Sequence, residues 1–298
     1  WTYKYDIAAE RGAAGAFIVH ETGPAGYPWE VVQGSWTDEQ FDLVTPDKNM
    51  SRVAVEGWFQ IDAAKALFEM AGLDFEEQKK AAGERSFRPV PMGVRARTAI
   101  RNRFRTVDSA NVAAKLEGGE ARDELVVYVA HWDHLGTDPK LADDAIFNGA
   151  FDNASGTAGL LEIAGAFSRL EPPPRRSVLF LAVTAEEQGL LGSRHYAENP
   201  LYPPQKTVAA INMDGINVWG RTRDITVVGL GQSTLDELAA EVAGEQGRVL
   251  RPDPEPEKGF YYRSDHFEFA KAGIPAFYPD GGVDFIGKPE GWGIENAR

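Results

Sequence analysis

The sequence contains no cysteine. Disulfides and thiolate ligands are therefore excluded, and a metal ion could be bound only by histidine and carboxylate side chains. Basic residues are also scarce, because 45 Asp and Glu outnumber 31 Lys and Arg and the formal net charge is −14. A nucleic-acid partner would need a clustered basic surface, so this charge argues against one. No apolar stretch approaches the length of a transmembrane helix, and no signal peptide is visible.

The composition is otherwise that of a globular protein, with 43% apolar and 26% charged residues in 298. That length suggests one large or two modest domains. From about residue 110 onward, apolar strand patterns alternate with helical ones, which predicts an α/β sandwich with a largely parallel central sheet. The predicted strands lie near 110–116, 124–130, 177–184, 207–213, 224–230 and 275–279, and the predicted helices near 155–170, 189–198, 233–246 and 264–272.

Two adjacent glutamates follow the most apolar of these strands. The strand at 177–184 ends at Thr184 and is followed by Ala185, Glu186 and Glu187. The carboxyl ends of strands are where open α/β sheets bind ligands. Neighbouring side chains of an extended segment point in different directions, so one carboxylate can hold a metal while the other handles protons. A solvated pair at the start of a helix is the alternative interpretation.

Three further segments place a histidine or carboxylate beside apolar residues. His131 and Asp133 follow the strand at 124–130, Asp152 lies in the loop 148–156, and Asp214 follows the strand at 207–213. Neutral imidazole and carboxylates are ordinary zinc ligands. Two zinc ions about 3.5–4 Å apart form a common hydrolytic centre. The four segments together therefore predict a metal centre at one edge of the sheet.

The strings at these positions resemble the co-catalytic zinc aminopeptidases of the secreted bacterial leucine-aminopeptidase type. The same superfamily includes glutamate carboxypeptidase II and the glutaminyl cyclases. The resemblance spans about residues 95–290, and it implies a three-layer α/β sandwich. The segments that carry it are Ala130–Gly136, Asn148–Gly156, Ala185–Ser193, Asn212–Asp214 and Tyr262–Phe267, with Gly273–Ala276 after them.

The resemblance implies two zinc ions and four of their ligands. His131 and Asp214 would bind one zinc, Glu187 would bind the other, and Asp152 would bridge them. In this family the last ligand is a histidine in a later Tyr-His motif. No such motif occurs in these residues, so we expect it beyond Arg298 and regard 91–298 as a peptidase domain cut at its C-terminus.

The resemblance also implies catalytic roles. Glu186 would be the general base that takes a proton from a metal-activated water, in line with the positioned acid–base groups of hydrolases. The carboxylate of Asp133 would accept a hydrogen bond from the second nitrogen of His131 and fix its tautomer. For His134 the sequence leaves two roles open, in the pocket or behind a ligand.

A later segment is expected at the rim of the site. Asp265 and His266 open a predicted helix there and would support the site rather than bind metal directly. Tyr262 and Arg263 are candidates for contacts with the substrate or its developing charge, and packing at the rim is their alternative role.

The first 90 residues resemble the later part of a protease-associated domain. A helix, the strand Gly15–His20, a Gly/Pro loop, the segment Val53–Trp58 and a helix near 60–71 support this partial domain. Five arginines at alternating positions indicate the solvent face of a strand rather than a nucleic-acid patch, namely Arg95, Arg97, Arg101, Arg103 and Arg105. Because relatives of this kind are mostly exported, we expect a secreted or periplasmic protein.

The predicted function is zinc-dependent exopeptidase, most simply an aminopeptidase with a peptide substrate. A carboxypeptidase of the glutamate carboxypeptidase type would use the same metals with a basic pocket, and Arg263 keeps that alternative open. A glutaminyl cyclase would bind a single zinc. A non-catalytic receptor-like relative would be expected to have lost ligands or the base, which are present here. The oligomeric state does not follow from the sequence.

Overall fold

The computed structural model describes residues 2–37 and 39–296. The chain divides into two compact units, Trp1–Val107 and Asp108–Arg298. We expected the division near residue 90. The residues from 91 to 107, which the expectation gave to the second domain, belong instead with the first unit.

The first unit is built on two parallel strands, β1 (Gly15–His20) and β2 (Val55–Gln60), which pair from Gly15 opposite Val55 onward. The hydroxyl of Tyr5 donates a hydrogen bond to the Gly57 carbonyl at 3.0 Å, which ties the first helix to β2. The helices are α1 (Thr2–Glu10), α2 (Thr22–Ala25), α3 (Trp29–Trp36), α4 (Ile61–Met70) and α5 (Phe75–Ala82).

The second unit contains a seven-stranded sheet in the order β10-β9-β11-β8-β4-β7-β3. Its central strands are parallel, as the sequence predicts, while β3 is antiparallel to β7 and β11 is antiparallel to β9. The strands are β3 (Val112–Leu116), β4 (Ala121–His131), β7 (Arg176–Val183), β8 (Thr207–Asn212), β9 (Asp224–Val228), β10 (Val249–Pro252) and β11 (Ala276–Asp280); β5 (Gly136–Thr137) and β6 (Ile146–Phe147) form a separate small pair.

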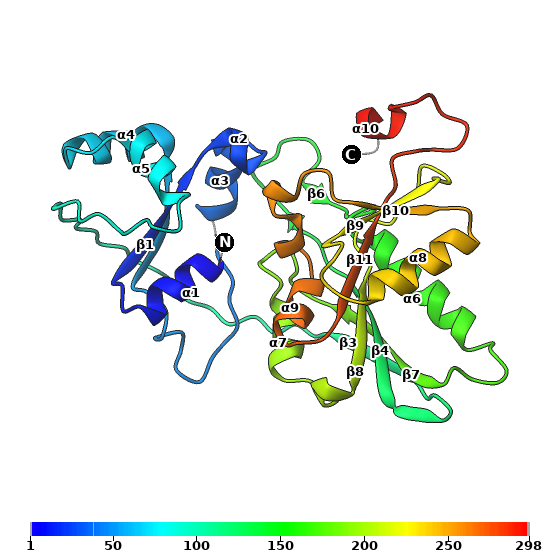
Figure 1. The fold of residues 1–298 in the computed structure, drawn as a ribbon. Coiled ribbons are helices and arrows are strands. Elements are labelled where there is room, and N and C mark those ends of the chain that lie inside the picture. The colour runs from blue at the N-terminus through cyan, green and yellow to red at the C-terminus, as the bar shows by residue number, and fades with distance from the viewer. Residues whose placement is uncertain (1, 38, 297–298) are drawn as a thin grey trace. The chain divides into compact units, whose positions relative to one another are not determined.

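Helices cover both faces of this sheet, so the unit is a three-layer sandwich (Figure 1). Alternate residues of β4 point to opposite faces, with Val127 in one core cluster and Ala130 in the other. The Val127 face packs against α7 and α9, and the Ala130 face packs against α6. The helices of this unit are α6 (Ala154–Phe167), α7 (Leu191–Glu198), α8 (Leu235–Glu245), α9 (His266–Lys271) and α10 (Trp292–Asn296).

The strand expected at the arginine-rich segment is not formed. Residues 88–111 adopt no helix or strand, although five arginines alternate within them. A strand needs a hydrogen-bonded neighbour, and the alternating segment contains too few apolar side chains to be buried against one. Alternation alone was therefore a misleading signal at this position.

In the part of the chain that the structure describes, no helix is both long enough and apolar enough to cross a membrane.

Candidate metal centre

Three neighbouring parallel strands end together and bring the predicted site residues to one edge of the sheet. The central strand β4 ends at His131, which pairs with Val183 at the end of β7. On its other side β4 pairs with β8, which ends at Asn212, two residues before Asp214. Because all three strands run in the same direction, their carboxyl ends meet at one edge.

One group of candidate ligands surrounds the imidazole of His131. Its Nε2 lies 3.0 Å from Oδ1 of Asp152 and 3.3 Å from Oδ1 of Asp214. His131 is 1% exposed, and its Nδ1 lies 2.9 Å from the backbone carbonyl of Asp133. A carbonyl can only accept, so Nδ1 carries the proton of the neutral ring and the Nε2 lone pair faces the two carboxylates. This is the tautomer that a metal ligand needs.

The charge around His131 strongly favours a cation. Burial of the ring lowers the pKa of His131, but the hydrogen-bonding carboxylates of Asp152 and Asp214 raise it more, and the net result is a pKa of about 12. A divalent ion would compete with a proton for the same place.

A second group of candidate ligands lies next to the first and shares Asp152 with it. His134, Asp152 and Glu187 each place one ligand atom within 4.8 Å of the others, as do His131, Asp152 and Asp214. The closest pair is His134 Nδ1 and Glu187 Oε1, at 2.6 Å. The shared carboxylate therefore stands between two sets of donors.

The start of α6 holds Asp152 in this position. The Asn153 side chain accepts a hydrogen bond from the Gly156 backbone N–H at 3.0 Å and donates one to the Met213 carbonyl at 2.9 Å. Asn153 thus joins the helix start to the segment that carries Asp214. A Cβ at Gly156 would lie 2.3 Å from the Asn153 carboxamide oxygen, so only glycine permits this close approach.

Glu186 is the more deeply buried of the two glutamates, with 8% of its surface exposed. Burial raises the pKa of its carboxyl well above the usual range, and the nearby charges of Asp265 and Asp214 raise it further. A carboxyl with a raised pKa can accept a proton and later return it. Glu187, its neighbour, points instead to His134.

The predicted hydrogen bond between the His131 ring and the Asp133 carboxylate is not formed. The backbone carbonyl of Asp133, not its side chain, lies at 2.9 Å from His131 Nδ1. Oδ2 of the carboxylate accepts hydrogen bonds from the Ala185 backbone N–H at 2.6 Å and from the Thr184 hydroxyl at 3.0 Å. The side chain points across to β7 because the chain turns after His131, and sequence spacing does not reveal that turn.

The late segment lies beside the site, as expected, but His266 does not reach the candidate ligands. Its ring packs between Tyr261 and Tyr278, with centroid distances of 4.9 Å to each, and burial lowers the pKa of the imidazole to about 4. Asp265 is 1% exposed, and its charge helps to raise the pKa of Glu186.

The two residues expected to contact the substrate, Tyr262 and Arg263, make contacts with nearby residues of the same segment. Tyr262 is 60% exposed and packs edge-on against Tyr261 and Phe267. Arg263 donates a hydrogen bond to the Lys258 carbonyl at 2.5 Å. Neither residue is among the candidate ligand groups, and their contact with substrate stays a prediction.

Sequence reasoning overlooked two polar partners of Asp214. Ser264 donates a hydrogen bond to Oδ2 of Asp214 at 2.5 Å and receives one from the Asn212 side-chain amide at 2.6 Å. The hydroxyl of Tyr278 lies 3.5 Å from the Asp214 carbonyl. Ser264 lies 50 residues from Asp214 in the sequence, so the two residues come together only in the folded chain. The polar side chain of Ser264, just before α9, was the sequence feature that could have suggested this contact.

A hollow of about 290 Å³ lies beside the second group of donors. His134 and Asn153 line it from the metal side, and Trp132 and Phe147 contribute apolar walls. Trp132 is 47% exposed and Phe147 is 39% exposed, so both offer apolar surface to a ligand.

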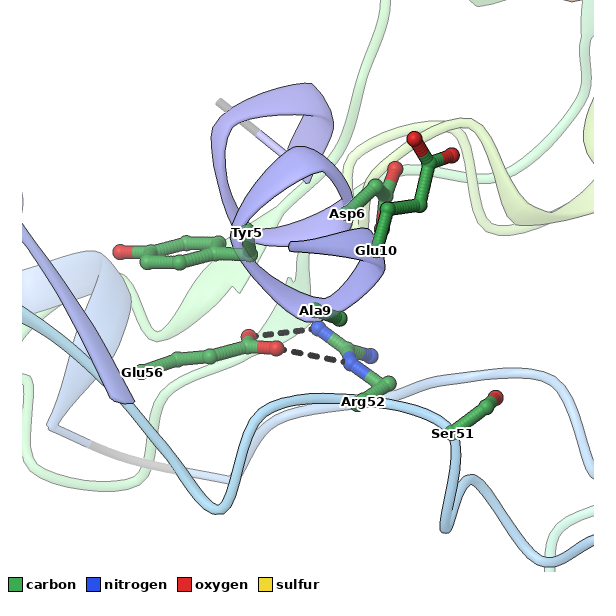
Figure 2. A pocket seen from close by; sticks show the side chains of 7 residues that line it. All are labelled: Tyr5, Asp6, Ala9, Glu10, Ser51, Arg52 and Glu56. Atoms are coloured by element: carbon green, nitrogen blue, oxygen red, sulfur yellow. Dashed lines mark hydrogen bonds and ion pairs between the residues drawn. The ribbon is translucent and has the colours of Figure 1, made fainter. Parts of the chain in front are cut away.

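The first unit has a hollow of its own, of about 360 Å³ (Figure 2). Arg52 is its central charge, and Figure 2 shows the guanidinium turned toward Glu56, with hydrogen bonds of 2.9 and 2.5 Å. Asp42 also contacts this guanidinium. The positive charge is therefore neutralised within the protein, and we assign no ligand to this hollow.

The donors of the metal centre fit zinc. Both groups consist of imidazole nitrogen and carboxylate oxygen, which are the ligands that catalytic zinc sites commonly use. Nε2 of His131 presents a lone pair, and the carboxylates supply the negative charge that a divalent ion requires.

Comparison with known proteins finds similarity to peptidases. The sequence profile of peptidase family M28 matches residues 111–292. Aminopeptidase NAALADL1 of Mus musculus is 36% identical over 129 residues, which are 42% of this chain and 16% of that protein. A probable zinc metalloprotease of Pyrenophora teres f. teres is 35% identical over 109 residues, 36% of this chain and 23% of that protein. The match thus spans less than a quarter of the length of either relative.

Among solved structures, an aminopeptidase from Aneurinibacillus sp. strain AM-1 has a similar fold. The TM-score is 0.50 at 21% identity, and the similarity covers 95% of this chain and 58% of that chain. It supports the three-layer α/β sandwich described above.

Proposed function

The chain belongs to peptidase family M28 and is a zinc-dependent metallopeptidase, and on that premise we propose that it is an aminopeptidase that removes N-terminal residues from peptides with two zinc ions. The observation that carries the proposal is the pair of donor groups that share Asp152. A shared carboxylate between two sets of imidazole and carboxylate donors suits two ions at the short separation of hydrolytic centres.

The proposed ligands divide between two positions. His131 and Asp214 hold one zinc, Glu187 holds the other, and Asp152 serves both. Zinc, when bound, supplies Lewis acidity and lowers the pKa of water near it. The protein's own contribution begins with orientation. Ser264 fixes Asp214 by a 2.5 Å hydrogen bond, and the Asp133 carbonyl fixes the ring of His131.

Glu186 is the proposed general base. It lies beside a ligand, it is buried, and its pKa is raised by burial and by neighbouring acidic groups. Its carboxylate would accept the proton of the attacking water and deliver it to the leaving amine. A positioned group of this kind typically contributes about 10²–10⁴ in rate.

The substrate's first side chain would occupy the hollow beside His134. Trp132 and Phe147 line it with apolar surface, so apolar N-terminal residues are favoured over charged ones. The acidic metal edge suits the positively charged α-amine of a free N-terminus, which is the group that separates an aminopeptidase from a carboxypeptidase.

The test is hydrolysis of a peptide panel by the zinc-loaded protein. The panel pairs each free N-terminus with its acetylated form and compares leucine or phenylalanine with aspartate or lysine at the first position. We expect cleavage of free, apolar N-termini, and loss of about 10²–10⁴ in kcat for Glu186→Gln. Glu162→Gln, at an exposed position of α6, is the matched control and should retain full activity. Preferential release of C-terminal residues would overturn the proposal.

A further inference from the structure

The turn that carries the two glutamates has an unusual backbone. This glutamate turn runs from Thr184, directly after β7, to Gly192, the second residue of α7. Within it, Ala185 and Leu190 have φ values of +54° and +61°. The left-handed region is costly for residues with a Cβ, and such residues stay there only where the surrounding structure holds them. The position of Glu186 therefore depends on the contacts that close this turn.

The two ends of the glutamate turn meet directly. The Gly192 backbone N–H donates a hydrogen bond to the Thr184 carbonyl at 2.9 Å, and the Leu191 N–H donates one to the Ala185 carbonyl at 3.0 Å. A Cβ at Gly192 would lie 2.3 Å from the Thr184 carbonyl oxygen, so only glycine allows this close approach. The Thr184 N–H and the Gly192 carbonyl both contact one further side chain.

That side chain is Asn111, which directly precedes β3. Its Oδ1 accepts a hydrogen bond from the Thr184 N–H at 3.1 Å, and its Nδ2 donates one to the Gly192 carbonyl at 2.8 Å. The carboxamide thus joins both ends of the glutamate turn, much as a backbone peptide group would. A carboxamide offers a donor and an acceptor side by side, which neither a carboxylate nor an aliphatic side chain does.

The two residues before Asn111 contact the same region. Oγ of Ser109 lies 2.7 Å from Oγ1 of Thr184, and the Ala110 carbonyl accepts a hydrogen bond from Nε1 of Trp132 at 3.1 Å. Three consecutive residues therefore contact the segments that follow β4 and β7. Asn111 differs from the other two because its side chain bonds to both ends of the glutamate turn.

From these contacts we infer that Asn111 is a positioning residue for hydrolysis, which holds the glutamate turn closed and thereby keeps Glu186 in place. The carboxamide bonds to backbone groups of Thr184 and Gly192, so its effect reaches Glu186 through the turn. The inference rests on the proposed function, because it takes Glu186 as the general base. A misplacement of about 1 Å can cost about 10²-fold in rate, so the loss of this contact should be measurable.

The first experiment compares zinc-loaded wild type, Asn111→Ala and Asn111→Asp on the peptide that wild type cleaves best. The alanine variant loses both hydrogen bonds, whereas the aspartate variant keeps the shape and the acceptor but cannot donate to the Gly192 carbonyl. We expect kcat of both to fall by about 10–100-fold with little change in KM, because a misplaced base affects the chemical step. If the alanine variant does not fold, the aspartate variant gives the same test.

Asn102→Ala is the matched control, since Asn102 is exposed and lies outside helices and strands. It should keep the kcat of wild type. Wild-type kcat in a folded Asn111→Ala, or in Asn111→Asp where the alanine variant does not fold, would overturn the inference. Zinc is measured in every sample, so that loss of metal is distinguished from misplacement of the base.

A double-mutant cycle tests whether Asn111 acts through Glu186. In Glu186→Gln the base is already absent, so adding Asn111→Ala should cause no further loss of kcat. Residues that act as a unit show such non-additive effects. A second loss as large as the one in wild type would mean that Asn111 influences hydrolysis by another route, and it would overturn the inference.

Amide hydrogen exchange tests the closed turn without turnover. The Thr184 N–H should be protected in wild type, because Asn111 accepts its hydrogen bond. In Asn111→Ala it should exchange about 3–10-fold faster, the change expected for one hydrogen bond of typical strength. The N–H of Leu181, within β7, is the internal control and should exchange at its wild-type rate. An unchanged rate at Thr184 would contradict the inference.

The outcomes separate this inference from the proposed function. An active wild type and an equally active Asn111→Ala would reject the role of Asn111 and leave the aminopeptidase standing. A wild type that cleaves no peptide of the panel would reject the function. The exchange rate at Thr184 would then still decide whether Asn111 holds the glutamate turn closed.

Discussion

At the residue scale, Asp265 makes the stability of the second unit depend on pH. Its side chain is 1% exposed, so the carboxyl group is almost fully removed from water. Burial raises the pKa of this carboxyl from 3.8 to about 7. Because the folded pKa lies above the unfolded one, the proton stabilises the fold fully below about pH 4, and this stabilisation is lost as the pH rises to about 7.

Asp265→Asn should therefore gain stability over wild type as the pH rises. An amide stays neutral, so the free energy of unfolding of the variant relative to wild type should increase by roughly 2–4 kcal/mol between pH 4 and pH 8. Urea unfolding of the metal-free proteins measures the difference. Glu241→Gln, at an exposed position of α8, is the control. A difference that stays constant across this range would show that Asp265 is already ionised in the folded protein.

Sequence reasoning located most of the site but few of its contacts. Four predicted ligands, His131, Asp152, Glu187 and Asp214, do lie at one edge of the sheet, and their binding of metal stays a prediction. They could be found because each follows an apolar strand or precedes a helix. The role of Ser264 could not be found in this way, since its partner Asp214 is distant in sequence and close only in the fold.

At the element scale, the Asp133 side chain joins the segment after β4 to the end of β7. Its Oδ2 accepts hydrogen bonds from Ala185 and Thr184, directly before the two glutamates. Ala185 has a φ of +54°, a left-handed conformation that costs a residue with a Cβ about 1 kcal/mol or more. The two hydrogen bonds help to hold the turn that positions Glu186 and Glu187.

Removal of this link should weaken zinc binding at the proposed Glu187 position more than at the proposed His131 position. In Asp133→Ala the turn loses both hydrogen bonds to Oδ2, so we expect zinc binding at the proposed Glu187 position to weaken by about 10–100-fold and activity to fall with it. The zinc bound by His131 should be retained, because the backbone carbonyl that orients this ring remains. Asp133→Asn keeps an acceptor oxygen and should lie close to wild type. Chelator competition measures both sites, and equal weakening of the two would contradict the assignment.

Elements with strong apolar patterns were predictable, and weakly apolar ones were not. Strand β7 was predicted at 177–184 and is observed at Arg176–Val183, because its side chains are buried on both faces. The edge strand β10 was missed, since its four residues have mostly exposed side chains and carry no alternation. The alternating arginines showed the opposite error, in which a pattern exists without a neighbouring strand to stabilise it.

At the scale of the whole molecule, the chain consists of two units with separate cores. The second unit contains every candidate metal ligand, and the family match lies entirely within it. The identity of the first unit as part of a protease-associated domain stays a prediction, as does export of the protein. We therefore expect zinc binding to need residues of the second unit alone.

Limited trypsin digestion tests that statement. The segment Arg95–Arg103 is exposed and lacks helix or strand, so its arginines should be cleaved first. Arg105 should be cut more slowly, because its guanidinium is held by Glu39 through two hydrogen bonds of 2.6 Å. Arg169 and Lys271, which lie within or next to helices of the second unit, serve as internal controls and should resist cleavage.

Mass spectrometry would identify the fragments, and metal analysis after gel filtration would measure their zinc. We expect the C-terminal fragment to retain all the zinc of the intact protein, since its ligands and the hydrogen bonds that orient them lie after residue 108. Loss of zinc on cleavage would mean that the first unit contributes directly to the metal centre.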